Sequence, residues 1–262
     1  MVRFPRLAAV LPVLTSLALV GCASDGGGVQ SQKMATIKGR GTVVCGVDGK
    51  LPGFSFVNPD GSYSGLDVDV CKAVAAALFG DPAKVDYRDL NSSERFAALA
   101  SGEVDLLSRN TTLTLSRDAS GGNGLSFAPT TFYDGQGVMV PVASGIKGLK
   151  DLAGQPICVE SGTTTELNLA DRMREINAAY TPLKFQTGDQ TYAAYLQGRC
   201  VAVTSDRSQL AAKRTSFPTP AAHTLLPEVL SKEPLTPATV NADPAWADAV
   251  RWTIYALMQA EE

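Results

Sequence analysis

Apolar and polar positions follow two different periodicities along the chain. Residues 42–47, 85–87 and 104–107 are short apolar or β-branched runs, which predict strands. Residues 67–79 instead carry apolar side chains three and four positions apart, at Val70, Val74, Ala77 and Leu78. This spacing predicts a helix with one buried face. The first half of the chain is therefore expected to alternate strands with helices.

The second half repeats this alternation. Residues 156–159 and 201–203 are predicted strands, and a helix is predicted over residues 163–176. Thr163 opens that helix and Glu166 follows three positions later, which is the spacing of a capping box. The whole pattern indicates an α/β fold with largely parallel sheets.

The first 21 residues have the pattern of a bacterial signal peptide. Arg3 and Arg6 precede an apolar stretch over residues 7–20, which is short for a transmembrane span. The stretch ends in Leu19-Val20-Gly21-Cys22, which resembles a lipobox, where the signal is cut before the cysteine and the thiol is lipidated. We expect a periplasmic protein anchored by a lipid on Cys22, or a cell-surface lipoprotein in a cell with one membrane. An ordinary secretory signal is the alternative. Residues 22–36, rich in Ser, Gly and Gln, are predicted to be a flexible tether.

Composition narrows the possible partners. Roughly 225 residues follow the signal and tether, and 45% of the chain is apolar, which is enough for one large domain or two small lobes. The net charge falls from −3 to −5 when Arg3 and Arg6 are removed with the signal. A mildly acidic chain with scattered charge argues against nucleic acid as a partner.

Four cysteines remain besides Cys22, and they allow three disulfide pairings. We favour Cys45–Cys71 together with Cys158–Cys200, because each pair then lies within one lobe and export permits oxidation. A zinc site is the alternative, but the sequence has no Cys-x-x-Cys and its single histidine is His223. No metal site and no cofactor are expected.

Polar residues follow three of the predicted strands. Residues 109–117 come after the strand at 104–107, residues 162–165 after the strand at 156–159, and Ser205-Asp206 after the strand at 201–203. Open α/β sheets bind ligands at the carboxyl ends of their strands. These three segments are therefore expected to meet at one ligand site.

The residue types in these segments suit a zwitterion. The guanidinium fork of Arg117 can make two parallel bonds to a carboxylate, and the free N–H groups at a helix start, here Thr163 and Thr164, favour an anion. Asp206 is the candidate partner of an ammonium group. A surface position for Arg117 and a helix N-cap role for Asp206 are the alternatives. Together the three segments predict a site for an amino acid.

Several longer motifs resemble one known family. The run Gly65-Leu66-Asp67-Val68-Asp69-Val70, followed by Val74-Ala75 and Leu78, resembles the signature of bacterial solute-binding proteins of polar amino acid ABC transporters. Further runs resemble the subgroup of general L-amino acid-binding proteins; they span residues 108–117, 162–171, 226–235 and 250–252. The resemblance covers residues 39–262.

The resemblance implies a two-lobed periplasmic-binding-protein fold of type II, in which each lobe is a mixed, mostly parallel sheet flanked by helices. Lobe 1 would span residues 37–133 and lobe 2 residues 138–225, with residues 230–262 returning to lobe 1 and ending in a helix. Two crossing segments are expected near residues 133–140 and 224–232. The chain stops within the last predicted helix, earlier than is usual in this subgroup, so a short variant or a fragment is an alternative.

The resemblance also implies roles for individual residues. It assigns the ligand carboxylate to Arg117, and it leads us to expect the Asn110 carbonyl and the Thr112 hydroxyl around the ammonium. Leu51 and Phe54, with Gly53, would form the wall beside the ligand side chain. A wall without a dedicated charge would fit broad specificity.

The combined interpretation is a monomeric receptor that captures L-amino acids and delivers them to an ABC permease by lobe closure. A dehydratase-like enzyme on the same fold is one alternative, with Glu160 as its acid or base. A non-transport sensor partner and a truncated, non-functional fragment are the others.

Overall fold

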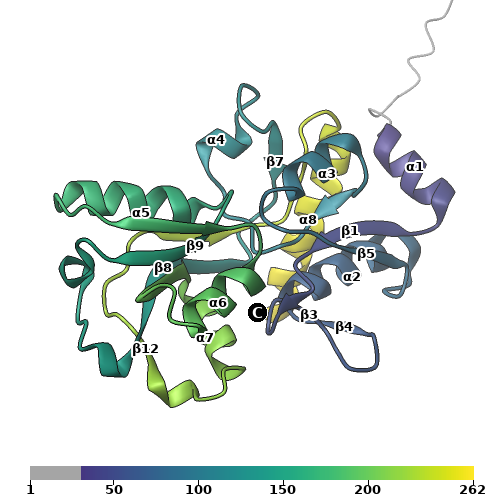
Figure 1. The fold of residues 1–262 in the computed structure, drawn as a ribbon. Coiled ribbons are helices and arrows are strands. Elements are labelled where there is room, and N and C mark those ends of the chain that lie inside the picture. Colours follow the sequence, from purple (N-terminus) through teal and green to yellow (C-terminus); the bar gives the residue numbers. More distant parts are fainter. Residues whose placement is uncertain (1–30) are drawn as a thin grey trace, which may run out of the picture. The chain divides into compact units, whose positions relative to one another are not determined.

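The computed structural model describes residues 31–262, which form one compact unit with two α/β lobes (Figure 1). The predicted signal peptide, Cys22 and most of the predicted tether lie outside the described residues. The first sheet has the strand order β5-β1-β6-β14-β7. Its strands are β1 (Val43–Val47), β5 (Val85–Asp89), β6 (Leu106–Leu107), β7 (Leu125–Phe127) and β14 (Ala238–Val240). Strand β1 is parallel to β5 and β6, whereas β14 is antiparallel to β6 and β7, so this sheet is mixed as expected.

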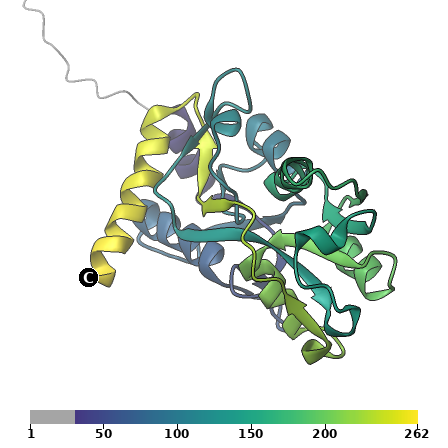
Figure 2. The same cartoon turned by 90° about the vertical axis from the view of Figure 1, so that its left-hand side faces the viewer.

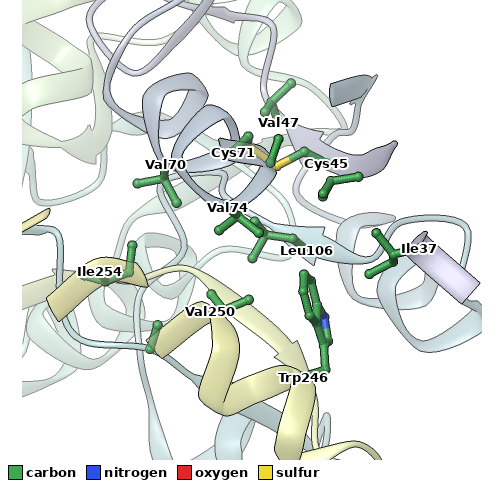
Figure 3. Close-up of a cluster of buried hydrophobic side chains, with 13 residues drawn as sticks. Ile37, Cys45, Val47, Val70, Cys71, Val74, Leu106, Trp246, Val250 and Ile254 are labelled. Carbon is green, nitrogen blue, oxygen red and sulfur yellow. A yellow bond between two sulfur atoms is a disulfide. The ribbon is translucent and has the colours of Figure 1, made fainter. Parts of the chain in front are cut away.

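Helices cover both faces of the first sheet. Helices α1 (Gln32–Arg40), α2 (Leu66–Phe79) and α8 (Pro244–Glu261) pack in one core cluster and α3 (Arg95–Ser101) in another, and the short helix α4 (Leu115–Asp118) lies near β7. A small antiparallel sheet of β2 (Lys50–Leu51), β3 (Ser55–Val57) and β4 (Tyr63–Ser64) precedes α2. The apolar stripe predicted for α2 is buried through Val70 and Val74, which pack with Trp246 and Ile254 of α8 (Figure 3). Helix α8 therefore lies beside α2 (Figure 2), although the two helices are far apart in the sequence.

The second sheet has the strand order β10-β9-β11-β8-β12. Its strands are β8 (Phe132–Pro141), β9 (Pro156–Glu160), β10 (Thr181–Phe185), β11 (Ala202–Asp206) and β12 (His223–Leu225). Helix α5 (Thr164–Glu175) packs on one face, and α6 (Gly188–Leu196) and α7 (Arg207–Thr215) pack on the other (Figure 1). Short 3₁₀ turns complete the lobe: η1 (Val142–Ser144), η2 (Leu149–Leu152) and η3 (Pro220–Ala222).

Two antiparallel strands carry the chain between the lobes. The first residues of β8 pair with β13 (Lys232–Leu235), from Phe132 opposite Leu235 to Gly135 opposite Lys232. The rest of β8 belongs to the second sheet, where it pairs with β11 and β12. The two crossing segments expected from the sequence are therefore present as a paired ribbon, with the second of them a few residues later than expected. Any motion of the lobes relative to each other must bend this ribbon.

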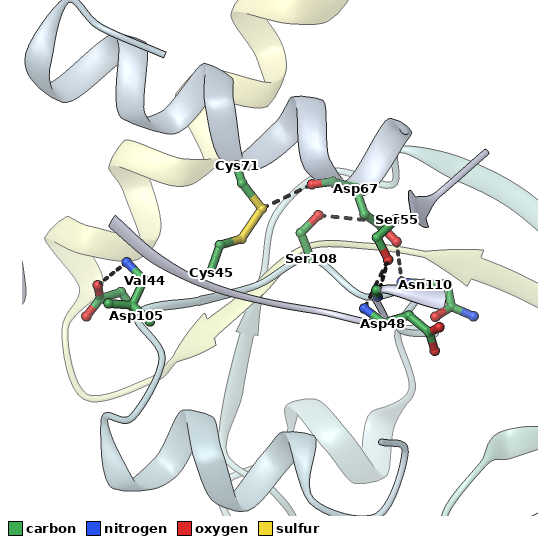
Figure 4. Close-up of a disulfide and its surroundings, with 10 residues drawn as sticks. Val44, Cys45, Asp48, Ser55, Asp67, Cys71, Asp105, Ser108 and Asn110 are labelled. Carbon is green, nitrogen blue, oxygen red and sulfur yellow. Dashed lines mark hydrogen bonds between the residues drawn. A yellow bond between two sulfur atoms is a disulfide. The ribbon is translucent and has the colours of Figure 1, made fainter. Parts of the chain in front are cut away.

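Both disulfides favoured from the sequence are present. Cys45 is joined to Cys71, which ties β1 to α2 (Figure 4). Cys158 is joined to Cys200 in the second lobe. Each bond closes a loop within one lobe, so neither restricts movement of one lobe against the other. Closing loops of this length stabilises a fold by about 3–4 kcal/mol in the chain-entropy model.

The flexible tether predicted over residues 22–36 extends too far toward the C-terminus. Residues 32–36 belong to helix α1, whose first turn is capped by the Ser31 hydroxyl accepting from the Met34 N–H. Ile37 on this helix is fully buried against the first sheet, and this burial explains why the segment is ordered. No helix within residues 31–262 is both long and apolar enough to cross a membrane.

Candidate functional site

A small pocket, here called the inner pocket, lies where the two lobes meet. Its volume is about 20 Å³, which is the scale of one water molecule. Lobe 1 lines it with Ser92, Arg95, Arg109, Asn110 and Thr112, and lobe 2 with Glu160, Thr163, Thr164, Thr165, Ser205, Asp206 and Gln209. The three segments that follow predicted strands therefore do meet at one place.

Asp67 holds the lobe 1 loop of the inner pocket. Its carboxylate accepts hydrogen bonds from the Asn110 N–H at 2.8 Å and from the Ser108 hydroxyl at 3.3 Å (Figure 4). Asn110 has a positive φ of 33°, a conformation that Asn tolerates better than most residues. Burial raises the pKa of Asp67 to about 6, and the bond from Asn110 opposes that rise. The sequence analysis missed this supporting role.

Two arginines of lobe 1 line the inner pocket. Arg109 donates to the Leu90 carbonyl at 2.7 Å and to Asp48 at 2.8 Å, and it lies 3.8 Å from Glu160 of lobe 2. Arg95 is also buried, but its Nε has no hydrogen-bond partner among the described residues. Burial, followed by the nearby guanidinium of Arg117, lowers the pKa of Arg95. A buried cation with a free donor is suited to an anionic group of a ligand.

Arg117 lies behind the lining of the inner pocket. Its Nη1 donates to the Thr112 carbonyl at 2.7 Å, and its guanidinium stacks 5.0 Å from the Phe96 ring. Burial lowers the pKa of Arg117 to about 10. The side chain is thus buried rather than on the surface, and it supports the backbone of a lining residue. Arg95, which the sequence analysis did not single out, lines the pocket together with Arg109, whereas Arg117 does not.

Helix α5 points its N-terminus at the inner pocket. The Thr163 hydroxyl accepts from the Glu166 N–H at 3.1 Å, as a capping residue does. Glu166 reaches back to the Gly162 N–H at 3.0 Å and not to Thr163, so only half of the predicted capping box forms. The remaining first-turn amides and the helix dipole favour an anion at this end of the helix.

Asp206 ends strand β11 and is almost fully buried. It occupies the position before α7, but its side chain makes no capping hydrogen bond within the described structure, so the N-cap alternative does not explain this carboxylate. Asp134 instead accepts from the Ser208 N–H at 3.2 Å. Burial, and next the negative charge of Glu233, raises the pKa of Asp206 to about 8. A cation in the pocket would stabilise the ionised carboxylate.

Glu233, on the returning strand β13, completes the surroundings of the site. Its carboxylate accepts hydrogen bonds from the Thr112 hydroxyl at 2.6 Å and from the Thr164 hydroxyl at 2.8 Å. Asn168 donates to its other oxygen at 2.8 Å, and Ser231 also bonds there. In the sequence, Glu233 stands out only as one residue of the run 226–235 that resembles the family. Its role depends on contacts with residues 65 to 121 positions away.

A larger cavity of about 170 Å³, here called the outer cavity, adjoins the inner pocket. The two share Arg109, Glu160 and Gln209 as lining residues. The outer cavity is rich in charge, with Asp48, Lys50, Asp89, Glu94, Asp189 and Lys213 in its lining. At its rim Lys50 of lobe 1 lies 3.0 Å from Asp189 of lobe 2.

Leu51 and Phe54 do not line either cavity. They are buried in an apolar cluster with Leu235, and Phe54 packs edge-on against Phe132 at 5.2 Å. The expectation of a cleft wall formed by these two residues is therefore corrected, because their side chains fill the space between β2 and the crossing strands. The wall that the structure provides carries charges of both signs. Within residues 31–262 no three His, Cys, Asp or Glu side chains are grouped to hold a metal ion.

Residues 43–262 match the family described as bacterial extracellular solute-binding proteins, family 3. The chain is 48% identical to the general L-amino acid-binding periplasmic protein AapJ of Rhizobium johnstonii, over 97% of this chain and 71% of that protein. It is 45% identical to the glutamate/glutamine/aspartate/asparagine-binding protein BztA of Rhodobacter capsulatus, over 90% of this chain and 69% of that protein.

Solved structures with the same fold include an ABC transporter periplasmic binding protein from Brucella ovis with glutathione bound. The two are 47% identical with a TM-score of 0.84, and the match covers 88% of this chain and 72% of that chain. A cysteine-binding protein from Campylobacter jejuni is 27% identical with a TM-score of 0.78, over 87% and 88% of the two chains. These similarities agree with the two-lobed fold described above.

Proposed function

We propose that this chain, which belongs to the bacterial extracellular solute-binding proteins of family 3, captures L-amino acids and delivers them to an ABC permease. The observation that carries the proposal is the meeting of opposite charges in the inner pocket. Arginines come from lobe 1, and Asp206 with a helix N-terminus comes from lobe 2. An α-carboxylate and an α-ammonium on one carbon are the ligand groups that match this arrangement.

In the proposed complex the carboxylate binds between the lobe 1 guanidinium groups and the start of α5. Arg95 lines the inner pocket, and Arg117 lies behind this lining, where it donates to the Thr112 carbonyl. The amides at Thr163 and Thr164 face the pocket from lobe 2. The ammonium binds Asp206, the Asn110 carbonyl and the Thr112 hydroxyl. Both ends of the ligand then touch both lobes, so binding stabilises the closed arrangement.

The lobes must separate before a ligand can reach the site. The inner pocket is too small to admit an amino acid while the lobes are in contact. We propose that the β8–β13 ribbon bends to open the site, with lobe 1 spanning residues 37–133, lobe 2 residues 138–225, and residues 230–262 completing lobe 1. The ligand side chain then occupies the outer cavity, where charged linings favour polar side chains.

The proposal extends to the cellular setting. The protein would be a monomer attached to a membrane through a lipid on Cys22, without a cofactor and without chemistry on its ligand. Glu160, the carboxylate that an enzyme would use as acid or base, accepts from the Ser92 N–H at 3.4 Å and lies beside Arg109. These contacts suit a carboxylate that holds the two lobes together.

A thermal-shift screen of the oxidised protein against the twenty L-amino acids tests the proposed function. At a hundredfold excess over the dissociation constant, a ligand stabilises the folded state by about 2.7 kcal/mol. That corresponds to a rise in Tm of roughly 5–10 °C for a protein of this size. Matched amines that lack the carboxylate serve as controls. A cooperative melt without a shift for any amino acid would reject the proposal.

A further inference from the structure

The carboxylate of Glu233 lies where the two lobes and the crossing ribbon meet. The side chain is 1% exposed, and its partners come from lobe 1, lobe 2 and the ribbon itself. Thr112 of lobe 1 and Thr164 of lobe 2 both donate to the same oxygen, Oε2. Asn168 and Ser231 hold the other oxygen, so the carboxylate has a defined orientation.

These contacts decide where the two threonine hydroxyl protons point. A hydroxyl has a single proton to donate, and an ionised carboxylate can only accept. The distances of 2.6 and 2.8 Å to Glu233 are those of strong charge-assisted bonds, whereas the two hydroxyl oxygens are 3.4 Å apart. Both hydroxyl protons therefore point at Glu233, and each hydroxyl oxygen can only accept a hydrogen bond from a ligand.

Both hydroxyls belong to residues that line the inner pocket together with Asp206. The pocket thus presents two hydroxyl lone-pair sites and a carboxylate as hydrogen-bond acceptors. A primary ammonium has three N–H donors and no acceptor, so it matches these groups in number and kind. A carbonyl or an ether oxygen in the same place would face acceptors only.

We propose that Glu233 is a positioning residue that makes the site selective for a primary ammonium, by holding the protons of Thr112 and Thr164 away from the ligand. The inference rests on the proposed function and deepens it. It gives Thr164 two separate roles: its backbone N–H remains available to the ligand carboxylate, and its hydroxyl acts as an acceptor. Because Glu233 binds a hydroxyl from each lobe, the two hydroxyls become acceptors for the ligand only when the lobes close.

The test compares each L-amino acid with the 2-oxo acid that has the same side chain. Three pairs are measured by calorimetry: L-glutamate with 2-oxoglutarate, L-alanine with pyruvate, and L-leucine with 4-methyl-2-oxopentanoate. In Glu233→Gln the new amide can donate to one threonine, whose proton is then free to point into the pocket. We expect the ratio of amino acid affinity to 2-oxo acid affinity to fall at least about tenfold.

Ser231→Ala is the matched control, because it removes a bond to the other oxygen of Glu233 and leaves both pocket hydroxyls in place. Its affinity ratio should stay close to that of the wild type. A Glu233→Gln protein that melts cooperatively and keeps the wild-type ratio would overturn the inference while leaving the proposed function intact. If the wild type binds none of the amino acids, the proposed function fails, and the inference fails with it.

Thr164→Val provides a second test that does not depend on the folding of the Glu233 variant. It removes the hydroxyl and keeps the branched shape at the start of α5. If the hydroxyl accepts from the ammonium, the variant should lose amino acid affinity about fivefold or more and keep its affinity for 2-oxo acids. Equal losses for both ligand classes would mean that the hydroxyl donates to the carboxylate, and the inference would be wrong.

Discussion

The two faces of the inner pocket carry opposite charge. Lobe 1 contributes Arg95 and Arg109, with Arg117 behind them, whereas lobe 2 contributes the carboxylates of Glu160 and Asp206. Each set of like charges is costly to bury by itself, because charges lose hydration without gaining a partner. Closure brings the sets together, and a zwitterionic ligand would complete the pairing. Neither lobe alone therefore forms the site.

Removing the anion of lobe 2 should have the largest effect on binding. Asp206→Ala is expected to weaken the binding of every L-amino acid ligand by about 2–5 kcal/mol, because the ammonium loses a desolvated charge partner. Isothermal titration calorimetry measures the loss. Asp171→Ala, an exposed carboxylate of lobe 2, is the control. Normal binding by Asp206→Ala would show that this carboxylate of lobe 2 does not bind the ligand ammonium.

Removing a cation of lobe 1 should cost somewhat less, since several donors share the carboxylate. We expect Arg95→Ala to weaken the binding of L-amino acids by about 1.5–3 kcal/mol. The amino acid amides, which lack the carboxylate, should bind Arg95→Ala and the wild type about equally. Arg88→Ala, at an exposed position of lobe 1, is the control. An equal loss for acids and amides would show that Arg95 acts on the fold and not on the carboxylate.

The buried Asp206 should also make the ligand-free protein less stable as the pH rises. Its folded pKa of about 8 lies above the ordinary value of 3.8, so the folded state holds an extra proton between these values. Stability should then fall by up to about 1.4 kcal/mol per pH unit in that range. The nearby groups are Glu233 and Asp134, which raise the pKa, and Arg95 and Asn110, which lower it.

Urea denaturation at pH 6, 7 and 8 checks this slope. The range starts at pH 6 because Asp67, with a pKa of about 6, contributes a similar slope below it. Asp206→Asn should flatten the slope, since the amide does not titrate. If stability depends on pH equally in the wild type and in Asp206→Asn, the slope comes from another titrating group.

The Lys50–Asp189 pair at the rim of the outer cavity should contribute least to ligand binding. Lys50 and Asp189 join the lobes at 3.0 Å, but their side chains are 61% and 51% exposed. Lys50→Ala is expected to weaken ligand binding by no more than about 1 kcal/mol, and high salt should remove the difference. Lys72→Ala, an exposed lysine on α2, is the control. A loss as large as that of Asp206→Ala would make the rim part of the binding site.

Much of the fold could be predicted because its signals are local. The stripe of α2 is a spacing of apolar residues, and the start of α5 is set by Thr163 and Glu166 a few positions apart. Strand ends located Asp206 and the Asn110–Thr112 loop in the same way. The two disulfide pairings followed from placing each pair of cysteines within one lobe. The apolar wall of Leu51 and Phe54 was wrong because an apolar side chain near a site can equally well fill the core.

The sequence by itself therefore determined the alternating elements and most of the charged groups at the meeting edge of the lobes, because periodicity, capping and strand ends act over a few residues. The two lobes themselves were expected only from the resemblance to a known family. The tertiary structure alone decided the parts played by Arg95, Asp67 and Glu233. Each of them acts through partners brought close by folding, such as Thr112, which lies 121 positions from Glu233. Hydrogen-bond direction and burial depend on those distant partners, and no local pattern encodes them.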